Sequence, residues 1–432
     1  MGNLINMTSS YLWDIFLPLV ILLGMFVIYQ TIRYRNMISY RDANKWEWSK
    51  IKNSISISLS SKIGTGAIIG VLAAMFKNSS NGVGGEGIVL WIFLGMFILV
   101  PITYCEVLFS RITEKTPREF IDYNLNSKAG SIYTVCLVIL YTFGFVGFQL
   151  TGIQSVVKNF MTENIGYSFP KLNVLLFIIV PLIVIVSLIV ITKNHKLFIN
   201  CLASMITTII ILYGLFFLIF LVKTIDFLPK YLYLVWKDFI NFKSASIGIP
   251  IGLVIGFQRI IQISETGLGT SALASSDGNN SPRREALLQT ISTILTVVVA
   301  VIITSYVFSY GRYNLPNIML TQNGYQRITG YFTSVKAVTG YLGGAIIMIF
   351  FIISGFTTIL GSFHFINTTM QISENKRILF YIILISLSGM FSISNFNVIF
   401  DASDLLMFIV SSINIIAMFM FTIKNIKKFK VK

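Results

Sequence analysis

The sequence predicts an all-α polytopic membrane protein with about eleven transmembrane helices. Of its 432 residues, 55% are hydrophobic and only 12% are charged, and the mean hydropathy is +0.79. A soluble domain of this length has about twice as much charge. Taking roughly 20 apolar residues as one crossing, the predicted spans are 11–31, 53–76, 88–110, 131–158, 172–192, 197–222, 246–276, 286–310, 341–365, 378–395 and 399–423.

The first span is predicted to be a retained anchor whose N-terminus lies outside the cell. No basic region precedes it, no small-residue cleavage site follows it, and Arg33, Arg35 and Arg41 come directly after its end. Residues 1–14 contain no Lys or Arg, so an organelle transit peptide is not expected.

The net charge of +16 lies in the loops between the spans. With the N-terminus outside, the predicted cytoplasmic segments hold 21 of the 33 Lys and Arg residues and the external segments hold 10. The external ones belong mostly to the loops 223–245 and 311–340, and the tail 424–432 alone contains five Lys. This asymmetry predicts a multi-pass protein of the cell membrane with its C-terminus in the cytoplasm. The lipid bilayer is therefore an expected partner of the protein, and binding to nucleic acid is not expected.

Neither an enzyme nor a metal centre is predicted. Cys105, Cys136 and Cys201 lie in apolar spans without metal-ligand spacing, and His195 and His364 lack the companions that a metal site or a catalytic triad requires. No nucleophile elbow, phosphate-binding loop or dinucleotide fingerprint is present in the sequence. No cofactor is therefore expected.

Two spans contain paired glycines among Ser and Thr. The second span contains Gly64-Thr65-Gly66, and the seventh contains Gly267-Leu268-Gly269. Each glycine weakens a helix by about 1 kcal/mol relative to Ala, so both are places where a helix can unwind. Unwound backbone at membrane depth is tolerated where it is buried in protein or lines a cavity. Close helix packing through small residues is the alternative for either break alone.

The two breaks occupy matched positions in the two halves of the chain. This pattern predicts two inverted five-helix repeats with a binding site at their midplane. The predicted organisation is an anchor and basic linker at 1–52, a first repeat at 53–222, a second repeat at 246–423 and a basic tail at 424–432.

Several segments, in this order, resemble one family. They are Gly64-Thr65-Gly66-Ala67-Ile68 with Gly70, Trp91 through Glu106, Arg259 with the run Ile263–Thr270, Thr357-Thr358-Ile359-Leu360-Gly361, and Asp404 with Asn414. Together they resemble the sodium:alanine (alanine or glycine:cation) symporter family over nearly the whole chain. The resemblance implies a LeuT-like fold with one extra N-terminal helix. It also implies a secondary active transporter that couples sodium to a small neutral amino acid such as alanine or glycine.

The chain departs from the family pattern at four positions. Ala67 stands where the family has Asn, Thr151 and Ile153 stand where its Gln and second Asn are expected, and Ser362 stands where it has Trp. These positions lie near the family's ligand pocket, so they bear on substrate identity and on sodium stoichiometry.

A zwitterionic amino acid needs donors for its carboxylate and acceptors for its ammonium group. Backbone amides freed around Gly64, Thr65 and Gly66 lie at the positive end of the half-helix that follows, where a carboxylate is favoured. Carbonyls freed in the second break, from Ile263 through Ser264 to Gly267, can accept from the ammonium. Two aromatic residues are candidates to cover this site, with ordinary packing as the alternative: Phe148 and Phe257.

Thr357 and Thr358 offer two hydroxyl oxygens on one helix, which suits a hard cation. The resemblance implies a sodium site in which the carbonyls of Ser60 and Ile63 complete the ligand set. In the alternative, each threonine hydroxyl bonds back to its own helix.

Four ionisable residues lie inside predicted spans, where they are costly and usually paired or functional: Lys62, Glu106, Arg259 and Glu265. The two broken helices run in opposite directions, so Lys62 and Glu265 are expected on opposite sides of the cavity, and Glu106 is the expected partner of Lys62. A buried lysine that titrates would instead indicate coupling to protons.

The alternatives to sodium-coupled symport are a proton-coupled or altered-substrate transporter of the same fold and a transport-incompetent sensor on this scaffold. A channel would show a continuous polar pore, and an intramembrane enzyme would show a clustered catalytic set. The sequence shows neither pattern.

Overall fold

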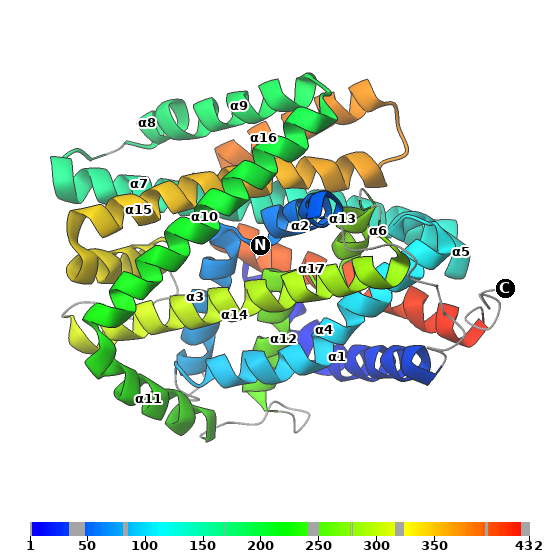
Figure 1. The fold of residues 1–432 in the computed structure, drawn as a ribbon, viewed down its shortest axis with the longest axis horizontal. Helices are drawn as coiled ribbons and strands as arrows, with labels where there is room; N and C mark the ends of the chain where they lie inside the picture. Colours follow the sequence, from blue (N-terminus) through cyan, green and yellow to red (C-terminus); the bar gives the residue numbers. More distant parts are fainter. Residues whose placement is uncertain are drawn as a thin grey trace.

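The computed structural model describes residues 2–33, 48–80, 85–168, 170–240, 250–276, 278, 280–315, 324–393 and 396–424, and these residues are overwhelmingly helical. Figure 1 shows long helices lying beside one another along the horizontal axis, with α10 crossing them obliquely. The predicted fold class, an all-α multi-pass membrane protein, is confirmed.

The helices of the first half are α1 (Gly2–Arg33), α2 (Trp48–Lys62), α3 (Thr65–Ser80), α4 (Ile88–Thr113), α5 (Pro117–Asn124), α6 (Ser127–Ile139), η1 (Leu140–Phe145), α7 (Val146–Ile165), α8 (Lys171–Val174), η2 (Leu175–Ile179), α9 (Val180–Ile191) and α10 (His195–Lys223). Those of the second half are η3 (Ile225–Phe227), α11 (Leu228–Ile240), α12 (Ile251–Ser264), α13 (Thr270–Ser275), α14 (Pro282–Asn314), α15 (Gly324–Thr369), α16 (Glu374–Ser392) and α17 (Phe396–Lys424).

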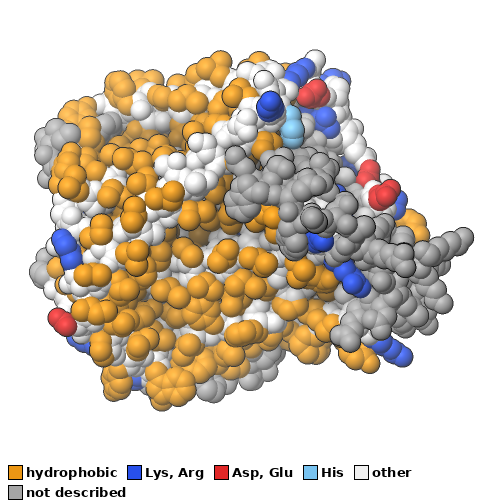
Figure 2. Space-filling model, viewed as in Figure 1, with side chains coloured by type: hydrophobic (Ala, Val, Ile, Leu, Met, Phe, Trp, Pro, Cys, Tyr) orange, Lys and Arg blue, Asp and Glu red, His pale blue; other side chains and the backbone are white. Residues whose placement is uncertain are grey.

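Among the described residues, seven helical segments are long and apolar enough to cross a membrane, and the bent pair Ile55–Lys62 plus Thr65–Phe76 makes an eighth. Leu17–Arg33 and Ile251–Ser264 are shorter apolar helices. Figure 2 shows hydrophobic side chains over the middle of one face and charged side chains toward its ends, as a bilayer requires. Eleven spans, the inverted repeat and the repeat boundaries remain predictions.

Local sequence signals explain several helix ends. Thr116 begins α5 with a capping box, in which its hydroxyl accepts from the Glu119 amide and the Glu119 carboxylate accepts from the Thr116 amide. Asn126 and Asn194 cap α6 and α10 through their side-chain oxygens. Gly166 ends α7 in the left-handed conformation, which a glycine adopts without strain.

Two helices lie in regions that the sequence predicted as external loops. The amphipathic helix α11 occupies the loop 223–245, and the first part of α15 occupies the loop 311–340. Gly340, with φ of 68°, separates that part from the rest of α15. The first part of α15 is buried at Ile328, Tyr331 and Phe332, so it packs onto the helix bundle.

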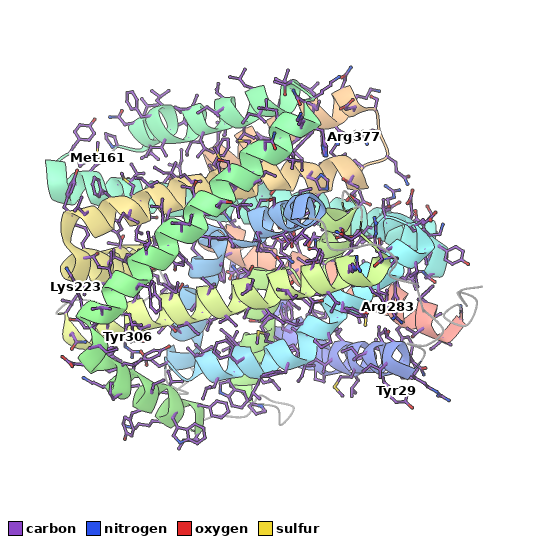
Figure 3. The ribbon with its side chains drawn as sticks, viewed as in Figure 1. Tyr29, Met161, Lys223, Arg283, Tyr306 and Arg377 are labelled. Atoms are coloured by element: carbon purple, nitrogen blue, oxygen red, sulfur yellow. The ribbon has the colours of Figure 1, made fainter. Side chains whose placement is uncertain are left out.

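The ends of the helices alternate as the predicted spans require. Figure 3 shows Met161, Lys223 and Tyr306 toward one end of the bundle, and Tyr29, Arg283 and Arg377 toward the other. The orientation of these two ends relative to the cell remains a prediction.

At the first of these ends, Glu86 joins the segment before α4 to α14. Its carboxylate accepts from Ser309 Oγ at 3.0 Å and pairs with the Arg312 guanidinium at 3.3 Å, and its backbone amide donates to the Asp238 carboxylate of α11. Glu86 is fully buried. Loss of hydration raises the pKa of its carboxyl group, and the Arg312 charge opposes this rise only in part.

Candidate functional site

The first predicted break is present. α2 ends at Lys62, α3 begins at Thr65, and the two helices bend by 45° across the residues between them. Gly64 is needed here because a Cβ at this position would lie 2.5 Å from Thr358 Oγ1 and 2.8 Å from Gln149 Nε2. The glycine therefore lets α7 and α15 approach the backbone of the break closely.

The backbone amide at the start of α3 is held by a side chain from α7. Gln149 Oε1 accepts from the Thr65 amide at 2.8 Å and from the Thr65 hydroxyl at 2.6 Å. Gln149 is only 2% exposed, so this contact is sealed from solvent. The sequence pattern predicts Thr151 and Ile153 at the family's Gln and Asn positions, whereas in the structure a glutamine two residues earlier, Gln149, reaches the break. The signal in the sequence is a pair of glutamines, Gln149 and Gln154, in a predominantly apolar span.

Two residues of the expected cation site, Thr358 and Ser60, are in contact. Thr358 Oγ1 donates at 3.0 Å to the carbonyl of Ser60, near the end of α2, and also lies 3.0 Å from the Ser354 carbonyl of its own helix. Thr357 Oγ1 donates to the Ser354 carbonyl. α15 thus brings Thr358 to Ser60, with Ile63 at the end of the same turn, while the Thr357 hydroxyl bonds back to its helix. Sodium binding by these residues remains a prediction.

The second predicted break separates α12 from α13. Three of its residues have positive φ, with values of 58° at Glu265, 81° at Gly267 and 88° at Gly269. The carbonyls freed there already have donors: Asn414 Nδ2 donates to the Gly267 carbonyl at 2.9 Å, and the Tyr133 hydroxyl donates to the Leu268 carbonyl at 2.7 Å. A substrate ammonium would therefore compete with Asn414 for the Gly267 carbonyl.

Ser264 and the neighbouring Thr266 form a small hydroxyl chain at the same break. Ser264 Oγ lies 2.8 Å from Thr266 Oγ1, which in turn lies 2.9 Å from Thr103 Oγ1 of α4. All three residues are buried. The chain ties the break to α4.

The two candidate aromatic residues have different surroundings. Phe148 is 1% exposed, and its ring lies beside Gly66, where a Cβ would be 3.5 Å from Phe148 Cδ2. Phe257 instead packs against Gly95 of α4. Within the described residues, Phe148 therefore lies at the first break and Phe257 lies at α4.

Next to Phe148, the buried ion pair of Arg259 and Asp404 packs against the ring of Phe400. Phe148 and Phe400 have ring centroids 5.5 Å apart, and the Arg259 guanidinium lies 4.9 Å from the centroid of Phe400. Arg259 also pairs with Asp404 at 2.5 Å, and the side chains are 0% and 3% exposed. This series of contacts, from Phe148 through Phe400 to Arg259, connects the first break to α12 and α17.

The expected pairing of Lys62 with Glu106 is wrong. Lys62 Nζ donates to Ser271 Oγ and to Thr293 Oγ1, each at 3.0 Å. The Glu106 carboxylate accepts from Asn414 Nδ2 at 3.2 Å and from the Ala272 amide at 3.3 Å. Within the described residues, no ion pair shorter than 4 Å involves Lys62. Two hydroxyl groups hold the ammonium, so the carboxylate is free to bind the backbone of α13.

The prediction that Lys62 and Glu265 lie on opposite sides of the cavity is also wrong, because the Glu265 side chain reaches the residue next to Lys62. Its Oε2 accepts from Ser61 Oγ, next to Lys62, and from Thr270 Oγ1, both at 3.0 Å. The left-handed turn at Glu265 directs the side chain past the break toward the end of α2. The two broken helices therefore meet through a carboxylate.

Comparison with known proteins places this geometry in context. The model of the sodium:alanine symporter family matches residues 1–431. A probable sodium/glutamine symporter, GlnT of Bacillus subtilis strain 168, is 24% identical over 97% of this chain and 88% of its own length. The amino-acid carrier protein AlsT of the same organism is 22% identical over 96% of this chain and 88% of its own length.

A solved structure resembles most of the bundle. It is the substrate-bound outward-open state of a sodium-coupled sialic acid symporter, with a TM-score of 0.53 and 13% identity. The match covers 90% of this chain and 81% of that chain. At this identity the likeness concerns the fold.

Proposed function

The chain belongs to the sodium:alanine symporter family, a family of sodium-coupled amino-acid symporters, and from this premise we propose that it transports a small neutral amino acid such as alanine or glycine. It is a transporter of the membrane and not an enzyme. Its coupling ion is proposed to be sodium, and no other cofactor is proposed.

The contact between Thr65 and Gln149 is the observation that supports a carboxylate site. A backbone amide at membrane depth requires an acceptor, because an unpaired amide costs several kcal/mol in an apolar medium. In this structure the acceptor is the side-chain oxygen of Gln149. A substrate carboxylate can replace that oxygen at the Thr65 amide and bind the neighbouring Gly66 amide, and the Gly64 amide joins them once it releases the Lys62 carbonyl, to which it donates at 3.1 Å. The positive end of α3 favours the carboxylate further. Gln149 Nε2 is then available to donate to the same carboxylate.

The sodium site is proposed at the junction of α2 and α15. Its ligands are the carbonyls of Ser60 and Ile63 and the hydroxyls of Thr357 and Thr358. The short contact between Thr358 Oγ1 and the Ser60 carbonyl supports this choice, because it brings two oxygens from different helices together in a buried place. Unwound carbonyls with hydroxyl groups are suitable ligands for a hard monovalent cation.

In the membrane, we place the N-terminus outside and the C-terminus in the cytoplasm, in the cell membrane. The excess of Lys and Arg in the segments on the side of Arg283 and Arg377 supports this orientation.

Uptake into proteoliposomes tests the function. We expect an inward sodium gradient to drive uptake of radiolabelled alanine, with competition by glycine and serine and without competition by their amide derivatives, which lack the carboxylate. Glutamine is included because a relative is described as its symporter. Competition by the amides as strong as by the parent amino acids would show that the carboxylate site is wrong.

Two further outcomes separate the alternatives. Uptake driven by a pH gradient without sodium would establish the proton-coupled reading. Saturable amino-acid binding without uptake would show that the protein is a transport-incompetent sensor.

A glycine variant links the assay to the site. A Cβ on Gly66 meets Gln149 Nε2 at 3.2 Å and Phe148 Cδ2 at 3.5 Å, so Gly66→Leu should block the amides and abolish uptake. Gly214→Leu in α10 is the matched control, because a Cβ there meets nothing within 4 Å, and it should retain uptake.

A further inference from the structure

Lys62 lies where three elements meet, with its ammonium group turned inward. It is the last residue of α2 and is 3% exposed. Its Nζ binds Ser271 Oγ of α13 and Thr293 Oγ1 of α14 at equal distances of 3.0 Å. Two neutral oxygens from different helices therefore hold a cation, in the way that hydroxyl groups hold a bound metal ion.

Two buried carboxylates surround this cation without touching it. Glu265 and Glu106 are 2% and 4% exposed; Glu265 binds Ser61, the neighbour of Lys62, and Glu106 binds the amide of Ala272, the neighbour of Ser271. Glu265 accepts from Ser61 and Thr270, and Glu106 accepts from Asn414 and the Ala272 amide. Their hydrogen-bond partners in this structure are neutral groups, so the positive charge of Lys62 compensates them through space.

The three groups belong to the parts of the molecule that position both candidate sites. Lys62 precedes Ile63 of the first break, and Glu265 is the first residue of the second break. Removing a positive charge here would leave two carboxylates in a place of low dielectric constant, where an unpaired charge is costly. The position of the ammonium group would then favour a monovalent cation small enough to bind hydroxyl and carboxylate oxygens.

We propose that the Lys62 ammonium is a built-in substitute for a second exchangeable cation, so that this transporter moves one sodium ion with each amino acid. The inference rests on the proposed sodium-coupled function. The substitute is tethered to α2, so it neutralises Glu265 and Glu106 throughout the cycle without being transported. The exchangeable sodium is then the ion proposed at Ser60 and Thr358.

Counting sodium ions per substrate tests the proposal. Purified full-length protein in proteoliposomes is held at defined membrane potentials, and the substrate gradient at which net flux stops gives the sodium-to-substrate ratio. We expect a ratio of one for the unmodified protein and a ratio of two for Lys62→Met, because sodium can enter the vacated position. In Lys62→Met/Glu265→Gln the carboxylate charge is also removed, and the ratio should return to one.

A binding measurement keeps the test decisive if a variant does not transport. Sodium should raise the thermal midpoint of Lys62→Met in detergent by more than that of the unmodified protein, and the added rise should disappear in Lys62→Met/Glu265→Gln. Lys223→Met, at the exposed end of α10, is the matched control and should behave as the unmodified protein.

The outcomes separate this proposal from the function on which it rests. Absence of sodium-driven uptake by the unmodified protein would reject the function itself. Sodium-driven uptake with the same ratio and the same sodium-dependent midpoint shift in Lys62→Met would reject only the role of Lys62. Uptake that follows a proton gradient and loses this response in Lys62→Met would also overturn the proposal, because the lysine would then exchange its proton.

Discussion

Gln149 Oε1 accepts two hydrogen bonds from Thr65, one from the backbone amide at 2.8 Å and one from the hydroxyl at 2.6 Å. The side chain thus holds the amide that we assign to the substrate carboxylate, and it must release that amide when substrate binds. Gln149 and the substrate carboxylate therefore compete for the same backbone amide.

Replacing Gln149 with Glu should weaken substrate binding. The Glu carboxylate can still accept from Thr65, but it cannot donate to a substrate carboxylate and repels it at close range. We expect the KM for alanine to rise by roughly tenfold or more, since about 1.4 kcal/mol of repulsion corresponds to a factor of ten. Gln154→Glu on the same helix, where the side chain binds Ser392, is the control. Equal effects of the two changes on KM would argue against a special role for Gln149.

The two threonines of the cation site should contribute unequally. Thr358 reaches the Ser60 carbonyl of another helix, whereas the hydrogen bond that the Thr357 hydroxyl makes among the described residues is to Ser354 of its own helix. Thr358→Val should raise the sodium concentration for half-maximal uptake by roughly tenfold, the effect of losing about 1.4 kcal/mol of binding. Thr357→Val should have a smaller effect, and the double change should abolish sodium-dependent uptake. Uptake that survives the double change undamaged would exclude this site.

The buried pair Arg259–Asp404 should be needed for stability. Asp404→Asn leaves the Arg259 charge without its partner in a fully buried place, which should cost about 3–5 kcal/mol. Arg259→Met/Asp404→Leu removes both charges and should cost less. Thermal unfolding in detergent measures both. Asp122→Asn is the surface control, because its 3.7 Å contact with Arg118 is partly exposed and contributes about 1 kcal/mol or less. A double variant less stable than Asp404→Asn would contradict this account.

Glu86 should make stability depend on pH. Its pKa in the folded protein is raised above the ordinary value near 4.5, because burial removes water from the carboxylate. The folded state therefore binds the proton more tightly than the unfolded state, and this contribution to stability is present at acidic pH and lost as the pH rises through the raised pKa. The thermal midpoint of the unmodified protein minus that of Glu86→Gln should fall as the pH rises from below 4.5 to neutrality. A difference that grows with pH would contradict the assignment.

The orientation can be tested with single cysteines. In a background without Cys105, Cys136 and Cys201, a membrane-impermeant thiol reagent added outside intact cells should label Lys223→Cys and should not label Lys376→Cys until the membrane is permeabilised. Both positions are exposed, and Figure 3 shows Lys223 at one end of the helix bundle and Arg377, the neighbour of Lys376, at the other. The reverse labelling pattern would invert the proposed topology.

Part of the site could be predicted because glycine acts locally. Two pairs of glycines in apolar spans located both breaks, since loss of helix propensity is a property of the chain itself. The adjacent hydroxyls of Thr357 and Thr358 are also visible in the sequence, and the family resemblance indicates them as cation ligands. Helix α11 and the first part of α15 were missed, because hydropathy detects a spanning helix and not an amphipathic helix that lies along the bundle.

By itself, the sequence determined the class of protein, its long apolar helices and the two places where helices unwind, since each follows from composition and local propensity. Only the tertiary structure decided the partners. Gln149 reaches Thr65, Glu265 reaches Ser61, and Lys62 binds hydroxyl groups instead of Glu106. Which buried polar groups meet depends on helix rotation and depth, which packing of the whole bundle sets and no single segment encodes.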